Sequence, residues 1–373
     1  MLFDLISAST FSGTSRFGHS NVKRQCDKEI KNSHSFRCRW ELDGARRYIR
    51  ARIKTDFAFG WGREINKITV LNRMPQFDRW VSPWPRTWPF AVFKRHHTEL
   101  NDIYWAGAIS AFSSSRVVKH SQISSDKKIS TILPIPAQQK KRMDFTREQW
   151  EKFTSDFQNW TRLAALMSAS SYFETYMKTV CQLALLSNPG VILRSPKAVD
   201  GISLLKSLST KHAKVHLEKV KEHVISITKG DWTSRVESYE GFFGSAPTVL
   251  LESVTALRDM QKLRNGVGHA FGRLIPDYDD PLTFAPKSFQ RLSEARLQTW
   301  LGTVEKCAVA IDEHLRCSHI GAFEALWKYH QWDKRIVGHR TEAQMIRDQF
   351  PDGQGAPASK QYFEQLIRFY KNL

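Results

Sequence analysis

From Met143 onward, hydrophobic residues recur at steps of three and four, which is the pattern of helices that bury one face. The longest such run spans 148–186 and ends at Asn188-Pro189-Gly190. A capping-box pair, Thr146 and Gln149, precedes its first turn. Turn residues bound the other predicted helices, which span 202–227, 233–243, 247–271, 288–315, 324–332, 342–348 and 359–373. The pattern therefore predicts an all-α helical bundle over about 143–318, followed by a C-terminal helical extension over 319–373.

Residues 1–142 have a different character and are treated as a separate region of unknown fold. Two short segments, 48–53 and 67–71, are rich in β-prone residues. Three prolines within 82–89 argue against a helix or central strand there, and 113–128 and 134–142 resemble linkers. A small β-rich fold and disorder both remain open. Met143 could also be the natural start of the chain, with 1–142 a wrongly extended reading frame.

The positive charge is concentrated in the same region. The chain of 373 residues carries a formal charge of +19, and residues 1–142 hold 26 Lys and Arg against 11 Asp and Glu, which leaves +4 for the remainder. Such an imbalance favours a polyanionic partner, although charge alone does not separate RNA from DNA or an anionic membrane surface. Tryptophans interleaved with arginine could stack on unpaired bases or form a β-rich core; they are Trp40, Trp61, Trp80, Trp84, Trp88 and Trp105.

Cysteine usage and hydropathy bear on location. The five cysteines are widely spaced without a Cys-x-x-Cys pair, and Cys181 and Cys307 fall within apolar helical patterns as small buried residues. This usage is typical of a reducing compartment. The N-terminal residues show no secretory leader, and no apolar run is long enough for a membrane span. We expect a cytoplasmic protein without a membrane association.

The candidate chemistry lies in Arg264-Asn265-Gly266-Val267-Gly268-His269, near the end of a predicted helix. An arginine can hold a phosphate with two hydrogen bonds, and a neutral histidine can accept or donate a proton near pH 7. Cleaving RNA without a metal requires both functions, because the ribose 2′-hydroxyl must be activated and the phosphate charge stabilised. The sequence thus favours a metal-independent endoribonuclease that needs no cofactor.

This segment resembles the signature of HEPN domains. The matching positions are Leu257-x-x-Met260-x-x-Leu263-Arg264-Asn265-x-x-x-His269, with further likeness in Tyr172-Phe-Glu-Thr-Tyr176 and Tyr239-x-x-Phe242-Phe-Gly244. The resemblance covers about residues 146–316. It implies an all-α bundle that dimerises and, in active members, cleaves RNA at a composite site across the dimer interface. Such members act as toxins or antiviral-defence effectors, so an antitoxin or a sensor protein is a candidate partner.

Helix geometry adds a reason to expect a homodimer. Asn265 and His269 share a helix face, whereas Arg264 lies about 140° from His269 around the axis. One straight helix cannot direct all three side chains to one atom, but a second copy can supply the remainder. In this hypothesis His269 is the general base toward the 2′-hydroxyl and Arg264 holds the phosphate. Asn265 orients the imidazole or binds phosphate, and the product is a 2′,3′-cyclic phosphate.

Other interpretations of the same residues stay open. Arg264 and His269 could simply stabilise the negative pole of a helix dipole. Glu174 on the first long helix could support the site as an orienting carboxylate, although a solvated or salt-bridged role is more common. Gly266 and Gly268 either loosen the helix or allow a close approach of another backbone. The alternative function is a catalytically inactive HEPN-like module that binds nucleic acid or a partner protein.

Three further groups are weaker candidates for metal binding. His212 and His216 have the i, i+4 spacing of ligands, but lysines surround them and no third ligand is near in sequence. Cys26, His34 and Cys38 lack a fourth ligand. The pair His96-His97 is expected to lie in a basic surface loop. We therefore predict no metal site.

Overall fold

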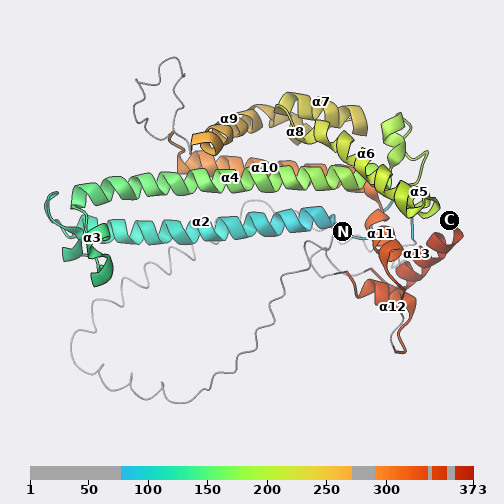
Figure 1. Cartoon of the computed structure of the whole chain (residues 1–373), viewed down its shortest axis with the longest axis horizontal. Helices are drawn as coiled ribbons and strands as arrows, with labels where there is room; N and C mark the ends of the chain where they lie inside the picture. The colour runs from blue at the N-terminus through green and yellow to red at the C-terminus, as the bar shows by residue number, and fades with distance from the viewer. Residues whose placement is uncertain (1–76, 271–289, 335–337, 351–357) are drawn as a thin grey trace, which may run out of the picture. The chain divides into compact units, whose positions relative to one another are not determined.

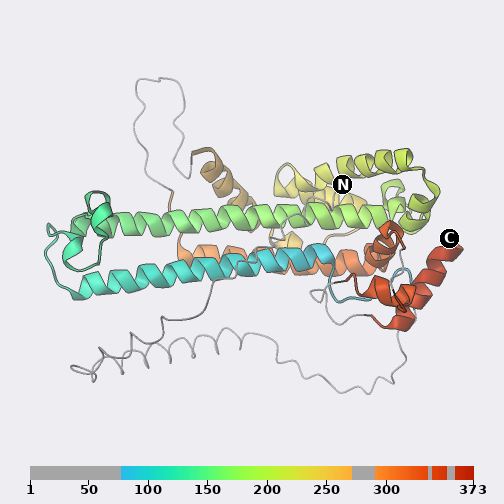
Figure 2. The same cartoon turned by 60° about the horizontal axis from the view of Figure 1, so that its bottom comes forward.

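The computed structural model describes residues 77–270, 290–334, 338–350 and 358–373, and within these ranges the protein is all-α. Its centre consists of α2 (Trp88–His120), α4 (Arg147–Ser187) and α10 (Glu294–Leu315). Figures 1 and 2 show these three helices side by side, with α2 antiparallel to both of the others. Among the described residues the structure has no strand, only an isolated bridge between Lys128 and Thr146.

Shorter helices surround this centre. On the side of α4 away from α2 lie α6 (Thr210–Thr228), α7 (Trp232–Phe243), α8 (Thr248–Glu252) and α9 (Val254–Ala270). Near the C-terminal end of α4 lie α5 (Gly201–Ser207), α11 (Phe323–Gln331), α12 (Glu342–Arg347) and α13 (Lys360–Asn372). Single turns connect them, namely α3 (Lys140–Met143), η1 (Ile129–Thr131), η2 (Ala137–Gln139), η3 (Pro189–Leu193) and the π-helical η5 (Arg316–Ile320).

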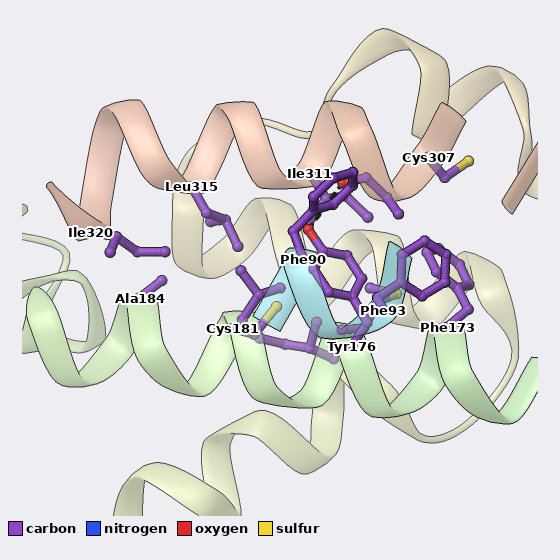
Figure 3. Close-up of a cluster of buried hydrophobic side chains, with 14 of the residues drawn as sticks. Phe90, Phe93, Phe173, Tyr176, Cys181, Ala184, Cys307, Ile311, Leu315 and Ile320 are labelled. Atoms are coloured by element: carbon purple, nitrogen blue, oxygen red, sulfur yellow. Dashed lines mark hydrogen bonds between the residues drawn. The ribbon is translucent and has the colours of Figure 1, made fainter. Parts of the chain in front are cut away.

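The second half of α4 is buried on most of its circumference because helices contact it from several sides. Figure 3 shows aromatic rings of α2 and α4 meeting beneath α10, among them Phe90, Phe93, Phe173 and Tyr176. The hydroxyl of Tyr176 donates to the carbonyl of Ala308 on α10 at 3.0 Å. Cys181 and Cys307 are buried in this core, as predicted, and burial raises the pKa of both thiols. The first half of α4 lacks such cover, since only Asn159 is buried before Leu163.

Two carboxyl groups hold the N-terminus of α2 in the core. The backbone N–H and the hydroxyl of Thr87, the N-cap residue, both donate to Asp312 of α10. The next N–H, that of Trp88, donates to Glu324 of α11 at 2.8 Å. Free N–H groups and the helix dipole make a helix start favourable for negative charge. Burial raises the pKa of Asp312, and it raises that of Glu324 to about 8.

Arg79 connects three parts of the fold. The whole residue is only 6% exposed. Its guanidinium pairs with Asp200 at 2.9 Å. It also donates to the carbonyl groups of Ser187 and Ile320, both at 3.0 Å. Asp200 in turn caps α5 by accepting from the N–H of Ile202. The ends of α4, α5 and η5 are therefore joined through one side chain.

The region before Met143 differs from the expectation of a small β-rich or disordered segment wherever it is described. Helix α2 begins inside the proline-rich stretch, with Pro89 in its first turn, where the absent N–H costs nothing. It continues through 113–120, so the prediction of a linker there is wrong. A compact turn follows, in which Ile129 N–H donates to the carbonyl of Phe145 at 2.8 Å. The predicted segments 48–53 and 67–71, with Trp40 and Trp61, lie outside the described residues.

The helices after residue 143 largely follow the prediction. The capping box of Thr146 and Gln149 is confirmed, as are the helices at 233–243, 324–332, 342–348 and 359–373 within a residue or two. Two predicted helices are each divided, at Leu208-Ser209 and at Ser253, and residues 290–293 precede α10 rather than belonging to it. The proline-containing loop at 276–286 lies outside the described residues. No helix in the described ranges is long and apolar enough to span a membrane.

Candidate functional site

Helix α9 presents the three predicted site residues on different parts of its surface. Leu257, Met260 and Val267 are buried and attach the helix to the bundle. Asn265 and His269 are exposed one turn apart on the outer face, whereas Arg264 is half-buried on the flank that faces α4. This distribution follows from the helical period, since positions 265 and 269 share a face that 264 does not.

Glu174 of α4 holds the guanidinium of Arg264. Its Oε2 accepts from Nη2 of Arg264 at 2.7 Å, and its Oε1 accepts from Nη1 of Arg235 at 3.2 Å. A second donor of Arg264, Nη1, bonds to Oδ1 of Asn265 at 3.1 Å. The structure thus brings Glu174, Arg264 and Asn265 together. The carboxylate is salt-bridged to two arginines, which is the commoner of the two roles considered for it.

His269 stands apart from this cluster. It forms no hydrogen bond or ion pair with any residue that the structure describes, and its side chain is exposed. Within one chain, about 140° of the helix surface separates His269, which could move a proton, from Arg264, which could hold a phosphate. Closing that gap requires a second molecule or a substrate that spans both groups.

Arg235 is the member of the cluster that sequence reasoning missed. It lies on α7 with its side chain 6% exposed, stacks over the ring of Trp232 at 4.8 Å and donates to the carbonyl of Gly230 at 3.0 Å. Gln261 of α9 donates to the same carbonyl at 2.8 Å. The spacing of Trp232 and Arg235 on one helix face was the available signal. Their partner Glu174 lies about sixty residues away in sequence, so periodicity could not reveal the contact.

A small pocket lies beside the cluster, between α4, α7 and α9. Its volume is about 10 Å³, which is roughly the space of a single water molecule. The lining includes Ser170, Glu174, Trp232 and Arg264. The hydroxyl of Ser170 is buried and has no hydrogen-bond partner among the described residues, so the lining of the pocket includes an unpaired polar group. A nucleobase does not fit here, and a polymeric substrate could reach the cluster only along the surface.

That surface is the outer face of α9, which is polar and carries positive charge. Arg258, Lys262, Asn265 and His269 repeat at steps of four, three and four, and all are exposed. One acidic residue, Asp259, lies beside them and pairs with Arg296 of α10 at 3.3 Å. A phosphate backbone could contact this face along about three helical turns, although exposed polar positions of this kind usually face only solvent.

The remaining predicted candidates do not form a second site. Ser209 lies 2.8 Å from Nδ1 of His212 at the start of α6, and the half-buried His216 has its pKa lowered by burial. His97 is buried in α2 with Nε2 3.2 Å from the carbonyl of Leu301, so the expected surface loop at His96-His97 is wrong. Among the described residues no group of three or more His, Cys, Asp or Glu could hold a metal. Cys26, His34 and Cys38 lie outside them.

Comparisons with known proteins identify no relative. No family model matches the chain, and neither the curated proteins nor the solved structures yield a match.

Proposed function

We propose that this protein is a metal-independent endoribonuclease of the HEPN type, acting as a toxin or an antiviral-defence effector. The observation that carries the proposal is the exposed, basic outer face of α9, on which Asn265 and His269 lie one turn apart with Arg264 at its edge. This face is open to a long polyanion, and it offers both a proton acceptor and a forked cationic donor.

In the proposed reaction, neutral His269 takes the proton of a ribose 2′-hydroxyl. The 2′-oxygen then attacks the adjacent phosphorus and the bond from phosphorus to the 5′-oxygen breaks. A protonated imidazole returns a proton to the leaving 5′-oxygen, so that the products are a 2′,3′-cyclic phosphate and a 5′-hydroxyl end. Arg264 stabilises the charge on the non-bridging oxygens, where donors already held in place are most effective. No external reactant is consumed.

The separation of Arg264 from His269 supports a site completed by a second copy of the chain. In a homodimer with facing α9 helices, His269 of one copy could act beside Arg264 of the other. Glu174 and Arg235 are positioning residues in this scheme, because the carboxylate fixes the guanidinium while the second arginine offsets its charge. An antitoxin or a sensor that covered the outer face of α9 would switch the activity off.

A second candidate function is supported by one observation. Glu174 already neutralises Arg264, and no described residue orients the imidazole of His269. A helical module that binds RNA or a protein through α9, without chemistry, would be consistent with that arrangement. This module and the enzyme differ in one measurable property, the scission of bound RNA.

The test uses purified full-length protein with labelled single-stranded and structured RNA in excess EDTA. We expect cleavage that leaves cyclic-phosphate ends, and a loss of at least about a hundredfold in His269→Ala and Arg264→Ala, the usual scale for removing an acid–base group or a charge-stabilising donor. His212→Ala is the matched control, since it removes an exposed histidine from α6. RNA binding without scission in the unaltered chain would favour the binding module.

A further inference from the structure

The α2–α4 arm, defined here as residues 105–120 of α2 and 147–158 of α4 with their connection, extends past the third helix of the bundle. Helix α10 begins beside Tyr104, whose hydroxyl donates to Glu294 at 3.3 Å. Beyond that point α2 and α4 continue as a pair (Figures 1 and 2). Val118 is the one buried residue of α2 after Tyr104. Two helices alone bury little, so their outer sides remain in water.

Two large apolar side chains share one exposed face of α2. Ile103 is 73% exposed and Val117 48%, and their separation of fourteen residues brings both to nearly the same side of the helix. Exposed apolar side chains that share a face can belong to a contact surface.

The exposed residues also follow the spacing of a helix–helix seam. Positions 103, 106, 110, 113 and 117 are separated by three, four, three and four residues, and all five are exposed. They are occupied by Ile103, Ala106, Ser110, Ser113 and Val117. Large residues at the ends and small ones in the middle allow two such helices to approach closely at the centre. The hydroxyl of Ser110 donates to the carbonyl of Ala106 at 3.1 Å, so it can be buried without losing its partner.

The charges beside this seam are complementary in only one of the two orientations in which two copies of α2 could pair. Asp102 and Arg116 lie on the same side of the seam, are exposed, and form no ion pair with a described residue. In an antiparallel pair centred at Ser110, Ile103 of each copy faces Val117 of the other. Asp102 then lies about two residues, roughly 3 Å of helix rise, from Arg116 of the other copy, which the long arginine side chain can span. In a parallel pair these flanking positions face the residues five further along the partner, Gly107 and Ser121, so neither charge meets an opposite charge. The helix is therefore complementary to itself in one orientation.

We propose that the outer face of α2 is a self-association surface, on which a second copy of this chain packs antiparallel with the two-fold axis near Ser110. Contacts between identical patches around such an axis are the commonest way in which soluble proteins form dimers. This contact is separate from the proposed catalytic face, because α2 and α9 lie on opposite sides of α4 in both views (Figures 1 and 2). A chain that used both contacts would form tetramers or open chains.

A charge swap in the full-length protein tests the surface by sedimentation equilibrium. Asp102→Arg or Arg116→Asp turns two symmetry-related attractions into repulsions, and we expect each to weaken self-association by about tenfold or more. Combining both substitutions restores opposite charges across the axis and should recover the unaltered association. Circular dichroism checks that the fold is kept. A monomeric unaltered protein, or single variants that associate normally, would overturn the proposal.

Paired cysteines test the orientation, in a background where Cys26, Cys38 and Cys317 are replaced by serine. Disulfide formation requires β-carbons within about 4 Å, so it reports which residues face each other. Ile103→Cys combined with Val117→Cys should give covalent dimers under mild oxidation, whereas either substitution alone should give none. Cross-linking by Ile103→Cys alone would show parallel pairing and contradict the model. His269→Ala should associate like the parent, which separates this contact from the proposed catalytic site.

Discussion

The side-chain amide of Asn188 selects the tautomer of a buried histidine, His319. Its oxygen accepts from the backbone N–H of Lys197 at 2.7 Å, which leaves its NH₂ group to face Nδ1 of His319 at 3.2 Å. An NH₂ group can only donate, so this ring nitrogen must be unprotonated. Burial, with the nearby His314 in second place, lowers the pKa of His319 to about 4. The native fold therefore contains a neutral imidazole that the unfolded chain would protonate below about pH 6.5.

This histidine should make the protein less stable in mild acid. Between about pH 6.5 and pH 4 the unfolded state binds the proton more readily, so the free energy of unfolding falls as the pH is lowered. The full effect is about 3 kcal/mol, from about 1.4 kcal/mol for each unit of pKa difference. Urea unfolding of the protein and of His319→Gln at several pH values measures it. We expect a smaller slope in the variant, and equal slopes would refute the assignment.

Glu324 has the opposite effect on the pH dependence of stability, and this decides how the contribution of His319 must be measured. Its pKa is raised by burial, so the native state retains a proton that the unfolded state releases above about pH 4.5. Stability from this group therefore declines as the pH rises toward about 8. Because the two effects overlap below pH 6.5, only a comparison with the His319 variant isolates the histidine.

At the scale of the helix, α9 contains two glycines, Gly266 and Gly268, that lie on different sides of Asn265. At about 100° per residue, Gly268 lies between Arg264 and Asn265 on the surface, whereas Gly266 lies on the other side of Asn265. A β-carbon at Gly266 would meet the side chain of Gln290 at 3.5 Å, and one at Gly268 would meet Met167 at 3.9 Å. Both are ordinary contacts, so neither glycine is required by the packing of the described residues.

Alanine at either position should therefore stabilise the protein, by up to about 1 kcal/mol each. Thermal unfolding measures the gain. The substitutions should differ in RNA cleavage, because Gly268→Ala places a methyl group between the proposed catalytic side chains and Gly266→Ala does not. We expect reduced cleavage in the first variant alone. If both variants cleave normally, a close approach of the substrate backbone at Gly268 is ruled out.

The helices that the sequence revealed are those with a continuous apolar face and clear boundaries. Helix α4 is one such case, with its capping box and the terminating Asn188-Pro189-Gly190. Helix α2 was missed because prolines surround its start, and because its last ten residues, 111–120, include three serines and place only Val118 in the core. The break at Ser209 was missed because apolar residues continue across it. The sequence pattern reveals a helix when packing places apolar residues at the helical period. It does not reveal a helix that packs weakly.

The candidate site was predictable only in part for a related reason. Arg264, Asn265 and His269 are neighbours in sequence, so their relative placement follows from the helix alone. The ion pairs of Glu174 with Arg235 and Arg264 join three helices, and charged residues on a sequence do not reveal their partners. The exposure of His269 likewise depends on which face of α9 the bundle covers.

At the scale of the whole described fold, Arg79 makes a contribution to stability that a single substitution can test. Replacing it by methionine leaves Asp200 without its ion-pair partner and removes the arginine donor from the carbonyl of Ser187, while the carbonyl of Ile320 keeps the hydroxyl of Ser187 as a donor. Breaking a buried pair in this way costs about 3–5 kcal/mol. Arg95→Met is the matched control, because Arg95 pairs with Glu99 on the surface of α2, where such pairs contribute under about 1 kcal/mol. Comparable losses in urea unfolding would contradict this ranking.

Helix α4 also has a mechanical consequence. Its 41 residues contain neither proline nor glycine and make a rod about 60 Å long. One end is anchored where Ser187 bonds to Ile320 and Arg79, Glu174 lies along its length, and the far end carries the arm. For a stiff lever of about this length, a tilt of roughly 5° at the anchored end moves the tip by about 5 Å. A partner that binds the arm therefore exerts a torque on α4, the helix that carries Glu174.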